Sequence, residues 1–475
     1  MNPRPAFASF VFTSAVLMCL GWGLRGYIGG GPLGAMIPGA FIALWLCILL
    51  GIDGRRAALV AAFGAVGIGI GGEMTYGQTL GLLRSNDTVA WGLLGTVVKG
   101  GVWGLLGGAL LGLGFVVQRL SFKQVALALL ACACAMVVGI ALINQPKLIY
   151  FSDPINKPRD EVWAGLLFGA VALLLVLKRY KEIQVPGWFA LYGTVGGMAG
   201  FGIGGALMAL GSRVEPPLRG LPWWKFMEFT FGACLGLAFG ACALHLRKVL
   251  SEKLEAEAVP VVVPWRALGG AVVMLGLGLV AWEATAEHLV TAASESALRS
   301  ALLPFAMVLL GYSTLAFVLM LLSLRYTTLA WQTALTMTFI ATIIDLQDDL
   351  AGENGILVAA SIRWAFVWST LIVSALLVLA WQRSTAPRLQ SALLALMWAC
   401  TAVAYARILV SPSVLAPAAD VTASLPMRFV AELEGHGIVH GIFTACAVYA
   451  TVAIYLHAGS TVTGADGFPD RKHVD

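Results

Sequence analysis

Four charged residues stand in otherwise apolar stretches, where they could do chemistry: Arg25 in GWGLRGYIGGG, Glu73 in GGEMTYGQ, Lys99 and Glu228. A charged side chain inside a membrane segment is costly, so it is by default a candidate functional group. The planar donor fork of an arginine, beside the N–H groups of a glycine-rich turn, suits a carboxylate or phosphate. We therefore predict an anion-binding site in which Arg25 meets the negative group.

Two polar neighbours, Tyr76 and Gln78, complete the predicted substrate-binding set, which is Arg25, Glu73, Tyr76, Gln78, Lys99 and Glu228. Counting about 1.5 Å per helical residue places the charged members in the outer half of the membrane. We expect Arg25, Glu73, Lys99 and Glu228 to converge on one hydrated pocket, with Lys99 pairing with Glu73. The alternative is that these groups extend towards lipid headgroups, as charges near helix ends commonly do. No catalytic residue is assigned.

The segment EGHGIVH places His436 and His440 one helical turn apart, with Glu434 nearby. This spacing occurs in HExxH zinc sites, but here no glutamate lies between the histidines and a third ligand must come from elsewhere. A structural or proton-handling role is favoured, and His436 and His440 are only an alternative metal site. The glycine-rich strings follow no strand, and neither a phosphate-binding GKS/T loop nor a GxSxG elbow occurs, so no metal and no cofactor is predicted.

The composition is that of a membrane protein. Of the 475 residues, 59% are hydrophobic and 12% charged, and the mean hydropathy is +0.86. Soluble domains carry about 25% charged residues, so the usual water-facing surface is missing. The net charge of +5 comes from basic residues scattered over short loops, which argues against nucleic-acid binding. The expected partners are membrane lipids and a small-molecule solute, and the chain is compatible with a homo-oligomer.

Apolar runs of about 20 residues span a bilayer as helices. The sequence predicts an all-α polytopic protein with 14 spans, over 6–23, 34–51, 57–80, 91–117, 124–144, 161–177, 187–210, 223–245, 265–284, 301–323, 327–345, 356–381, 389–408 and 436–457. Alternate loops, counted from the N-terminus, hold 17 of the 30 basic residues, and the opposite loops hold 10. By the positive-inside rule both termini are cytoplasmic, which predicts an integral protein of the cytoplasmic (inner) membrane.

The glycines are unevenly distributed along the chain, since 42 of the 55 precede residue 250. We predict a glycine-rich eight-helix bundle over 1–250, a cytoplasmic linker over 251–264, a six-helix bundle over 265–457 and a cytoplasmic tail over 458–475. Within the first bundle, Gly21–Gly39 holds eight glycines and two prolines. Because both residue types disrupt helices, we expect this segment to be broken or re-entrant.

A parallel four-plus-four repeat is a further hypothesis, since GIGIGG at 67–72 returns as GFGIGG at 200–205. The alternative is that the two segments resemble each other by chance, because glycine-rich helices have similar compositions. Small residues let helix backbones approach closely. We expect the third and fourth helices, and the seventh and eighth, to form the closest pairs, with Gly104 and Gly108 facing protein.

Two functions from different classes fit these features. The first is a transporter or permease for a small polar or anionic solute, favoured by the number of helices, the glycine-rich segment and the lack of energy-coupling motifs. The second is a membrane-embedded enzyme acting on a lipid-linked or periplasmic substrate from the outer face. The one-sided distribution of polar groups favours the enzyme, because transporters bind near the midplane. A membrane scaffold without catalysis is a third alternative. We favour transport.

Overall fold

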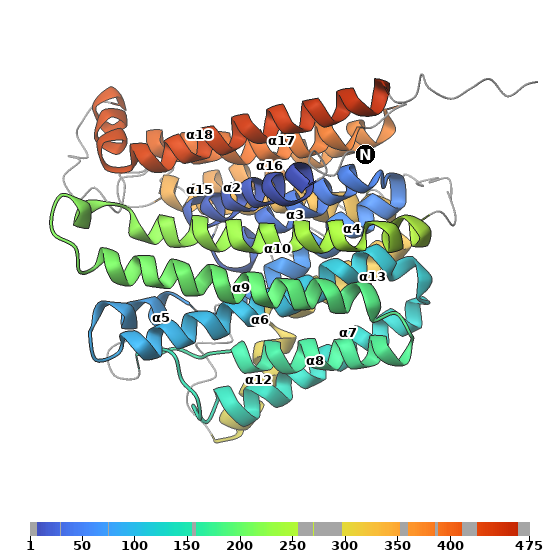
Figure 1. Ribbon diagram of the computed structural model, residues 1–475, viewed down its shortest axis with the longest axis horizontal. Helices are drawn as coiled ribbons and strands as arrows, with labels where there is room; N and C mark the ends of the chain where they lie inside the picture. The colour runs from blue at the N-terminus through green and yellow to red at the C-terminus, as the bar shows by residue number, and fades with distance from the viewer. Residues whose placement is uncertain are drawn as a thin grey trace, which may run out of the picture.

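Every regular element in the described part of the computed structural model is a helix, and the long helices lie side by side as a bundle (Figure 1). The structure describes residues 7–28, 30–74, 76–153, 158–254, 269, 297–351, 360–384, 388–410 and 425–463. Within these ranges, 11 helices are long and apolar enough to cross a membrane, or 12 if one bent pair counts as a single span. The protein is therefore an all-helical, multi-pass integral membrane protein, as the composition predicts.

The predicted count of 14 spans is not confirmed. The span expected at 161–177 is the helix α8 (Trp163–Arg179), whose 17 residues make it shorter than the 11 counted spans. The span expected at 301–323 is bent by 41° between Leu303–Leu309 and Tyr312–Arg325. The span expected at 265–284 lies outside the described residues. The remaining predicted spans all coincide with counted helices.

The described residues up to 254 contain eight long helices. They are α2 (Thr13–Ile28), α3 (Gly31–Leu50), α4 (Gly54–Ile70), α6 (Val89–Val116), α7 (Phe122–Gly139), α8, α9 (Gln184–Gly211) and α10 (Trp223–Leu254). The π-helical turn η1 (Ala8–Phe12) precedes α2, and η2 (Gly71–Glu73), α5 (Gly77–Gly81) and η3 (Leu82–Arg84) link α4 to α6. We call the side on which α2 ends and α10 begins the distal side, and the opposite side the proximal side.

Among the described helices, α6 packs most extensively with α9, and not with the neighbours that the sequence predicts. A Cβ atom added at Gly104 would overlap the carbonyl group of Gly193, and one added at Gly100 would overlap that of Gly197. Gly104 and Gly108 do face protein, as expected. Moving four residues forward along α6, from Gly100 to Gly104, corresponds to moving four residues backward along α9, from Gly197 to Gly193. The two helices therefore run antiparallel with their backbones in contact. The four-plus-four repeat is not confirmed.

A second glycine stripe determines how α10 lies on α2. Cβ atoms at Gly240, Gly236 and Gly232 would overlap the carbonyl oxygens of Phe10, Ser14 and Met18 in turn. The same antiparallel register, continued towards the distal side, brings Glu228 and Lys225 level with the end of α2. Glycine on α10 thereby positions two charged side chains beside Arg25.

The described backbone of Gly21–Gly39 is helical on either side of one interruption. Helix α2 continues through Gly21, Gly23 and Gly26 to Ile28, and α3 begins at Gly31. The interruption is therefore a short connection between two spanning helices. Gly21 lets α2 pack closely against Pro38 of α3: a Cβ atom at Gly21 would lie 2.7 Å from the Pro38 Cα.

The second part of the chain packs directly against α2, α3 and α4. Its elements are α12 (Ala297–Leu309), α13 (Tyr312–Arg325), α14 (Thr327–Trp331), η7 (Gln332–Met337), α15 (Thr338–Ala351), α16 (Ala360–Arg383), α17 (Leu389–Val410) and α18 (Leu425–Thr463). Helices α13 and α14 contact α4, α15 contacts α3, and α17 and α18 contact α2. Residues 255–264 of the predicted linker lie outside the described residues.

The outward faces of the bundle are apolar. On α9, exposed large apolar side chains recur every three to five residues from Trp188 to Ile203, and one more lies near the distal end. They are Trp188, Leu191, Val195, Met198, Ile203 and Leu210. A helix facing water would carry polar residues at these positions. This stripe therefore faces lipid, which agrees with the membrane class.

Candidate functional site

Two clusters of buried charged residues lie on the distal side. The first, which we call the Arg25 cluster, contains Arg25, Tyr76, Trp224, Lys225 and Glu228. The second, the Lys99 cluster, contains Thr79, Lys99, Phe151, Ser152 and Glu161. All the charged members are at most 5% exposed.

Arg25, on the last turn of α2, is surrounded by aromatic rings. Its guanidinium carbon lies 5.8 Å from the ring centre of Trp22, 5.0 Å from that of Tyr76 and 5.4 Å from that of Trp103. Nη1 donates to the Tyr76 hydroxyl, and Nη2 donates to the Gly31 carbonyl oxygen at 3.4 Å. These contacts hold the guanidinium in a largely water-free space where its charge interacts strongly with any neighbouring group.

Glu228, on the second turn of α10, accepts three hydrogen bonds. They come from Tyr76 Oη at 3.1 Å, Trp224 Nε1 at 3.0 Å and Lys225 Nζ at 2.8 Å. Burial raises the pKa of the Tyr76 phenol, so its hydroxyl keeps a proton to donate. Gly26 makes room for this carboxylate, since a Cβ atom there would overlap it.

The charges of the Arg25 cluster do not balance among the described residues. Lys225 forms an ion pair with Glu228, but Arg25 reaches Glu228 only through Tyr76. Arg25 Nε is buried and has no hydrogen-bond partner in the described part of the chain. Two cations with one carboxylate leave an excess positive charge, and buried charge requires a compensating partner.

Two residues of α17 and α18 border this cluster through Tyr27. The Tyr27 hydroxyl lies 3.3 Å from His440 Nε2. Lys225 Nζ and the Arg407 guanidinium carbon each lie 5.5 Å from the Tyr27 ring centre. The second part of the chain thus contacts the cluster at its edge.

The predicted histidine pair does lie on one helix, α18, and both His436 and His440 are buried. Among the described residues, no group of three or more His, Cys, Asp or Glu side chains could hold a metal ion. The side chain of Glu434 lies outside the described side chains. Contacts of His440 include the Tyr27 hydroxyl and the Phe443 ring, and Tyr405 Oη donates to its carbonyl oxygen at 3.1 Å.

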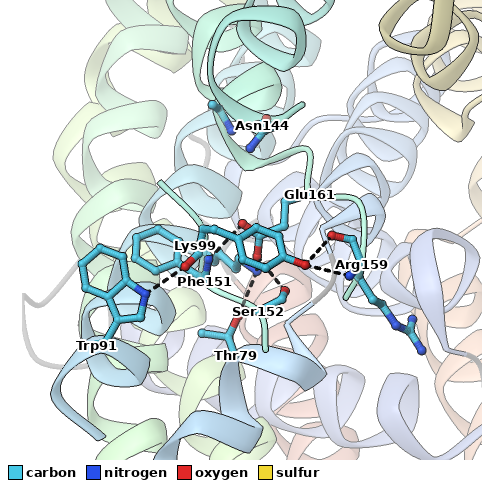
Figure 2. Close-up of polar contacts among 10 residues, drawn as sticks. Thr79, Trp91, Lys99, Asn144, Phe151, Ser152, Arg159 and Glu161 are labelled. Atoms are coloured by element: carbon cyan, nitrogen blue, oxygen red, sulfur yellow. Dashed lines mark hydrogen bonds and ion pairs between the residues drawn. The ribbon is translucent and has the colours of Figure 1, made fainter. Parts of the chain in front are cut away.

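The Lys99 cluster, by contrast, pairs its charges directly (Figure 2). Lys99 Nζ donates to Glu161 Oε1 at 2.6 Å and to Thr79 Oγ1 at 2.8 Å. The same carboxylate accepts from Phe151 N at 3.1 Å and from Ser152 Oγ at 2.8 Å. The pair is neutral and its oxygens are well satisfied, which is what a buried ion pair needs to be tolerated.

Hydrogen bonds in and around this second cluster hold the connection between α7 and α8 against α6. Trp91 Nε1 donates to the Tyr150 carbonyl oxygen at 2.8 Å, and Tyr150 Oη donates to the Arg159 carbonyl oxygen at 2.9 Å. Asn144 Oδ1 accepts from the N–H groups of Ala164 and Gly165 at the start of α8, at 3.1 and 3.2 Å. Figure 2 shows Trp91 and Arg159 on either side of Lys99 and Glu161.

The structure therefore brings together three of the predicted site residues, Arg25, Tyr76 and Glu228. It places Lys99 with Glu161 rather than with Glu73. Glu73 instead accepts from Ser313 N at 2.9 Å and from Ser313 Oγ, both on α13. Gln78 is half-buried on α5. Whether any of these residues binds a substrate stays a prediction.

Sequence reasoning missed two partners. Lys225 resembles a charge at a helix end that extends to the headgroups, yet it turns inward to Glu228, three residues further along the helix. That spacing is a usable signal, because such residues share a helix face. Glu161 ends a polar loop and gives no local sign of its partner, which lies 62 residues away.

Comparison with known proteins gives no relative: no family model, no curated protein and no solved structure matches this chain.

Proposed function

We propose that this protein is a transporter or permease for a small anionic solute, which binds at the Arg25 cluster. The observation that carries the proposal is the buried excess of positive charge, with two cations, one carboxylate and an unpartnered Arg25 Nε among the described residues. An anion there would supply the missing charge and accept from the guanidinium fork.

The surroundings of Arg25 support an organic anion as well as an inorganic one. The guanidinium is held by Tyr76 and by ring faces, so it is preorganised before a ligand arrives. Preorganised donors lose little entropy on binding, which raises affinity. The aromatic rings would also contact the apolar part of a carboxylate-bearing solute.

Transport is supported by the place of the cluster within the fold. It lies between α2, α10 and the 71–81 connection, and Tyr27 joins its edge to His440 on α18. Transporters commonly bind their solute where two groups of helices meet, because relative movement there changes access. Tyr27, Arg407 and His440 are at such a junction between the first and second parts of the chain.

The alternative is an enzyme that acts on a lipid-linked or periplasmic substrate. It is favoured by one observation, that both charged clusters lie on the distal side rather than spread across the bundle. The orientation proposed here, with both termini cytoplasmic in the inner membrane, would make the distal side periplasmic.

An anion panel tests the proposal. Purified protein would be titrated with the sodium salts of phosphate, sulfate, acetate, succinate and gluconate while thermal unfolding is followed. The same anions would then be applied as concentration jumps to proteoliposomes on a solid-supported membrane. We expect saturable stabilisation by at least one anion, with a transient current for the same anion, and loss of both in Arg25→Gln.

The matched control is Arg219→Gln, which removes an exposed arginine in η6 (Leu218–Gly220) on the same side. It should respond like the unmodified protein. Saturable binding without current would favour the enzyme. No saturable response to any anion, or an unchanged response in Arg25→Gln, would contradict an anion site at Arg25.

A further inference from the structure

A groove of about 580 Å³ lies at the proximal end of the bundle, where η1 meets the end of α10. Its walls include Phe7, Val11 and Leu244, which are apolar. Its basic lining residues, which we call the rim, are His245, Arg247 and Lys248. An apolar wall with a basic rim is the complement of a molecule that has a hydrocarbon chain and an anionic head.

The groove lies near the end of the spanning part of α10, where lipid headgroups are expected. The spanning part of α10 ends at Leu250, so the three basic residues occupy its last turns. Trp188 and Tyr192 on α9 adjoin them: the Tyr192 hydroxyl lies 3.0 Å from His245 Nδ1, and the Trp188 and His245 ring centres are 4.9 Å apart. Trp and Tyr are enriched at the boundary between membrane and water.

We propose that this groove is a binding site for an anionic phospholipid, whose phosphodiester contacts the His245–Arg247–Lys248 rim. Phe7 is 59% exposed, so its ring is available to line one acyl chain together with Val11 and Leu244. Basic pockets beside spanning helices bind anionic headgroups by charge attraction, and the apolar wall adds burial of the chain. The proposal does not depend on the anion site at Arg25, because it concerns the opposite end of α10.

Native mass spectrometry of the purified full chain tests this inference, with phosphatidylglycerol and phosphatidylcholine as probes. The unmodified protein should retain phosphatidylglycerol more tightly. A basic residue near an anionic headgroup contributes roughly fivefold in affinity, so Arg247→Gln with Lys248→Gln should weaken phosphatidylglycerol binding about 10- to 30-fold. Phosphatidylcholine binding should change little.

A matched control removes two other basic residues at the same membrane boundary. Lys178 and Arg179 occupy the exposed last turn of α8, also on the proximal side. The double variant Lys178→Gln with Arg179→Gln changes the net charge equally and should bind phosphatidylglycerol as the unmodified protein does. An equal loss in this control would mean general charge attraction, and would overturn the site.

Two further measurements separate a lipid from a free anion. Leu244→Trp keeps every charge but fills the groove wall, so it should also weaken phosphatidylglycerol binding. Inorganic phosphate at millimolar concentration should not compete with the lipid. Unchanged binding in both Leu244→Trp and the Arg247/Lys248 double variant, or full competition by phosphate, would contradict a lipid site. The charge-preserving pair Arg247→Lys with Lys248→Arg should retain binding, and its failure to do so would also count against the rim.

Discussion

The Arg25 and Lys99 clusters are buried at the same end of the molecule, but they hold their charges differently. Lys99 has a carboxylate partner at 2.6 Å, and that carboxylate is further satisfied by Phe151 and Ser152. Arg25 is linked to Glu228 only through Tyr76, and its Nε has no partner among the described residues. The Lys99 cluster is neutral and its carboxylate is hydrogen-bonded, as a structural ion pair requires. The Arg25 cluster has an excess positive charge among the described residues, which an anion would neutralise.

The largest effect is expected from breaking the neutral pair. Lys99→Met leaves Glu161 as a buried carboxylate without its cation, which typically destabilises a protein by about 3–5 kcal/mol. The double variant Lys99→Met with Glu161→Gln removes both charges and should recover most of that loss. Thermal unfolding in detergent measures both, and Lys99→Met with Glu73→Gln is the control that should show no recovery. Recovery with Glu73→Gln would mean that Glu73 is the partner after all.

Gly26→Ala should have the next largest effect, because its added methyl group would overlap the Glu228 carboxylate. Overpacking of this kind typically costs about 1–3 kcal/mol, and here it would also displace Glu228 from Tyr76. Gly30→Ala, where nothing lies within 4 Å of the added atom, is the matched control and should unfold at the same temperature as the unmodified protein. Equal stability of the two variants would contradict the register of α2 on α10.

Arg25→Lys separates folding from function within the Arg25 cluster. The substitution keeps the charge but removes the planar fork, so we expect about tenfold weaker anion binding, which corresponds to about 1.4 kcal/mol. The unfolding temperature without anion should change little. An Arg25→Lys variant that loses stability but keeps its anion response would assign this cluster the same structural role as the Lys99 cluster.

The smallest expected effect is that of Tyr150→Phe, which removes one half-buried hydroxyl from the connection above Lys99. That hydroxyl makes two exposed hydrogen bonds: it donates to the Arg159 carbonyl oxygen and accepts from Arg159 N. Each hydrogen bond contributes about 0.5–1.5 kcal/mol when buried, and water replaces these exposed partners, so a small fall in stability with an unchanged anion response is expected. Tyr76→Phe, the equivalent change in the Arg25 cluster, should alter the anion response as well. Identical behaviour of the two variants in the anion titration would remove the distinction between the clusters.

Several parts of the fold could be predicted because their signal is local. The membrane class and most span positions follow from apolar runs, as for Gly31–Leu50 and Val89–Arg119, which were expected at 34–51 and 91–117. How the glycines and prolines of 21–39 pack could not be predicted, for a reason that is not local. Glycine and proline weaken an isolated helix, but Gly21 and Pro38 fit against each other between α2 and α3.

Arg25, Tyr76 and Glu228 could be named as candidates because charge and polarity stand out in an apolar sequence. Helix depth predicted that Arg25 and Glu228 converge, but their contacts through Tyr76 could not be derived. Those contacts depend on the register in which Gly232, Gly236 and Gly240 pack against η1 and α2. Lys99 and Glu73 have the same kind of sequence signal, yet tertiary packing gives them different partners, Glu161 and Ser313. The sequence alone determined that this chain spans a membrane and that Arg25, Lys99 and Glu228 stand in apolar stretches, because hydropathy is a property of each segment. Only the tertiary structure decided which of those charges are paired, because pairing depends on which helices pack together.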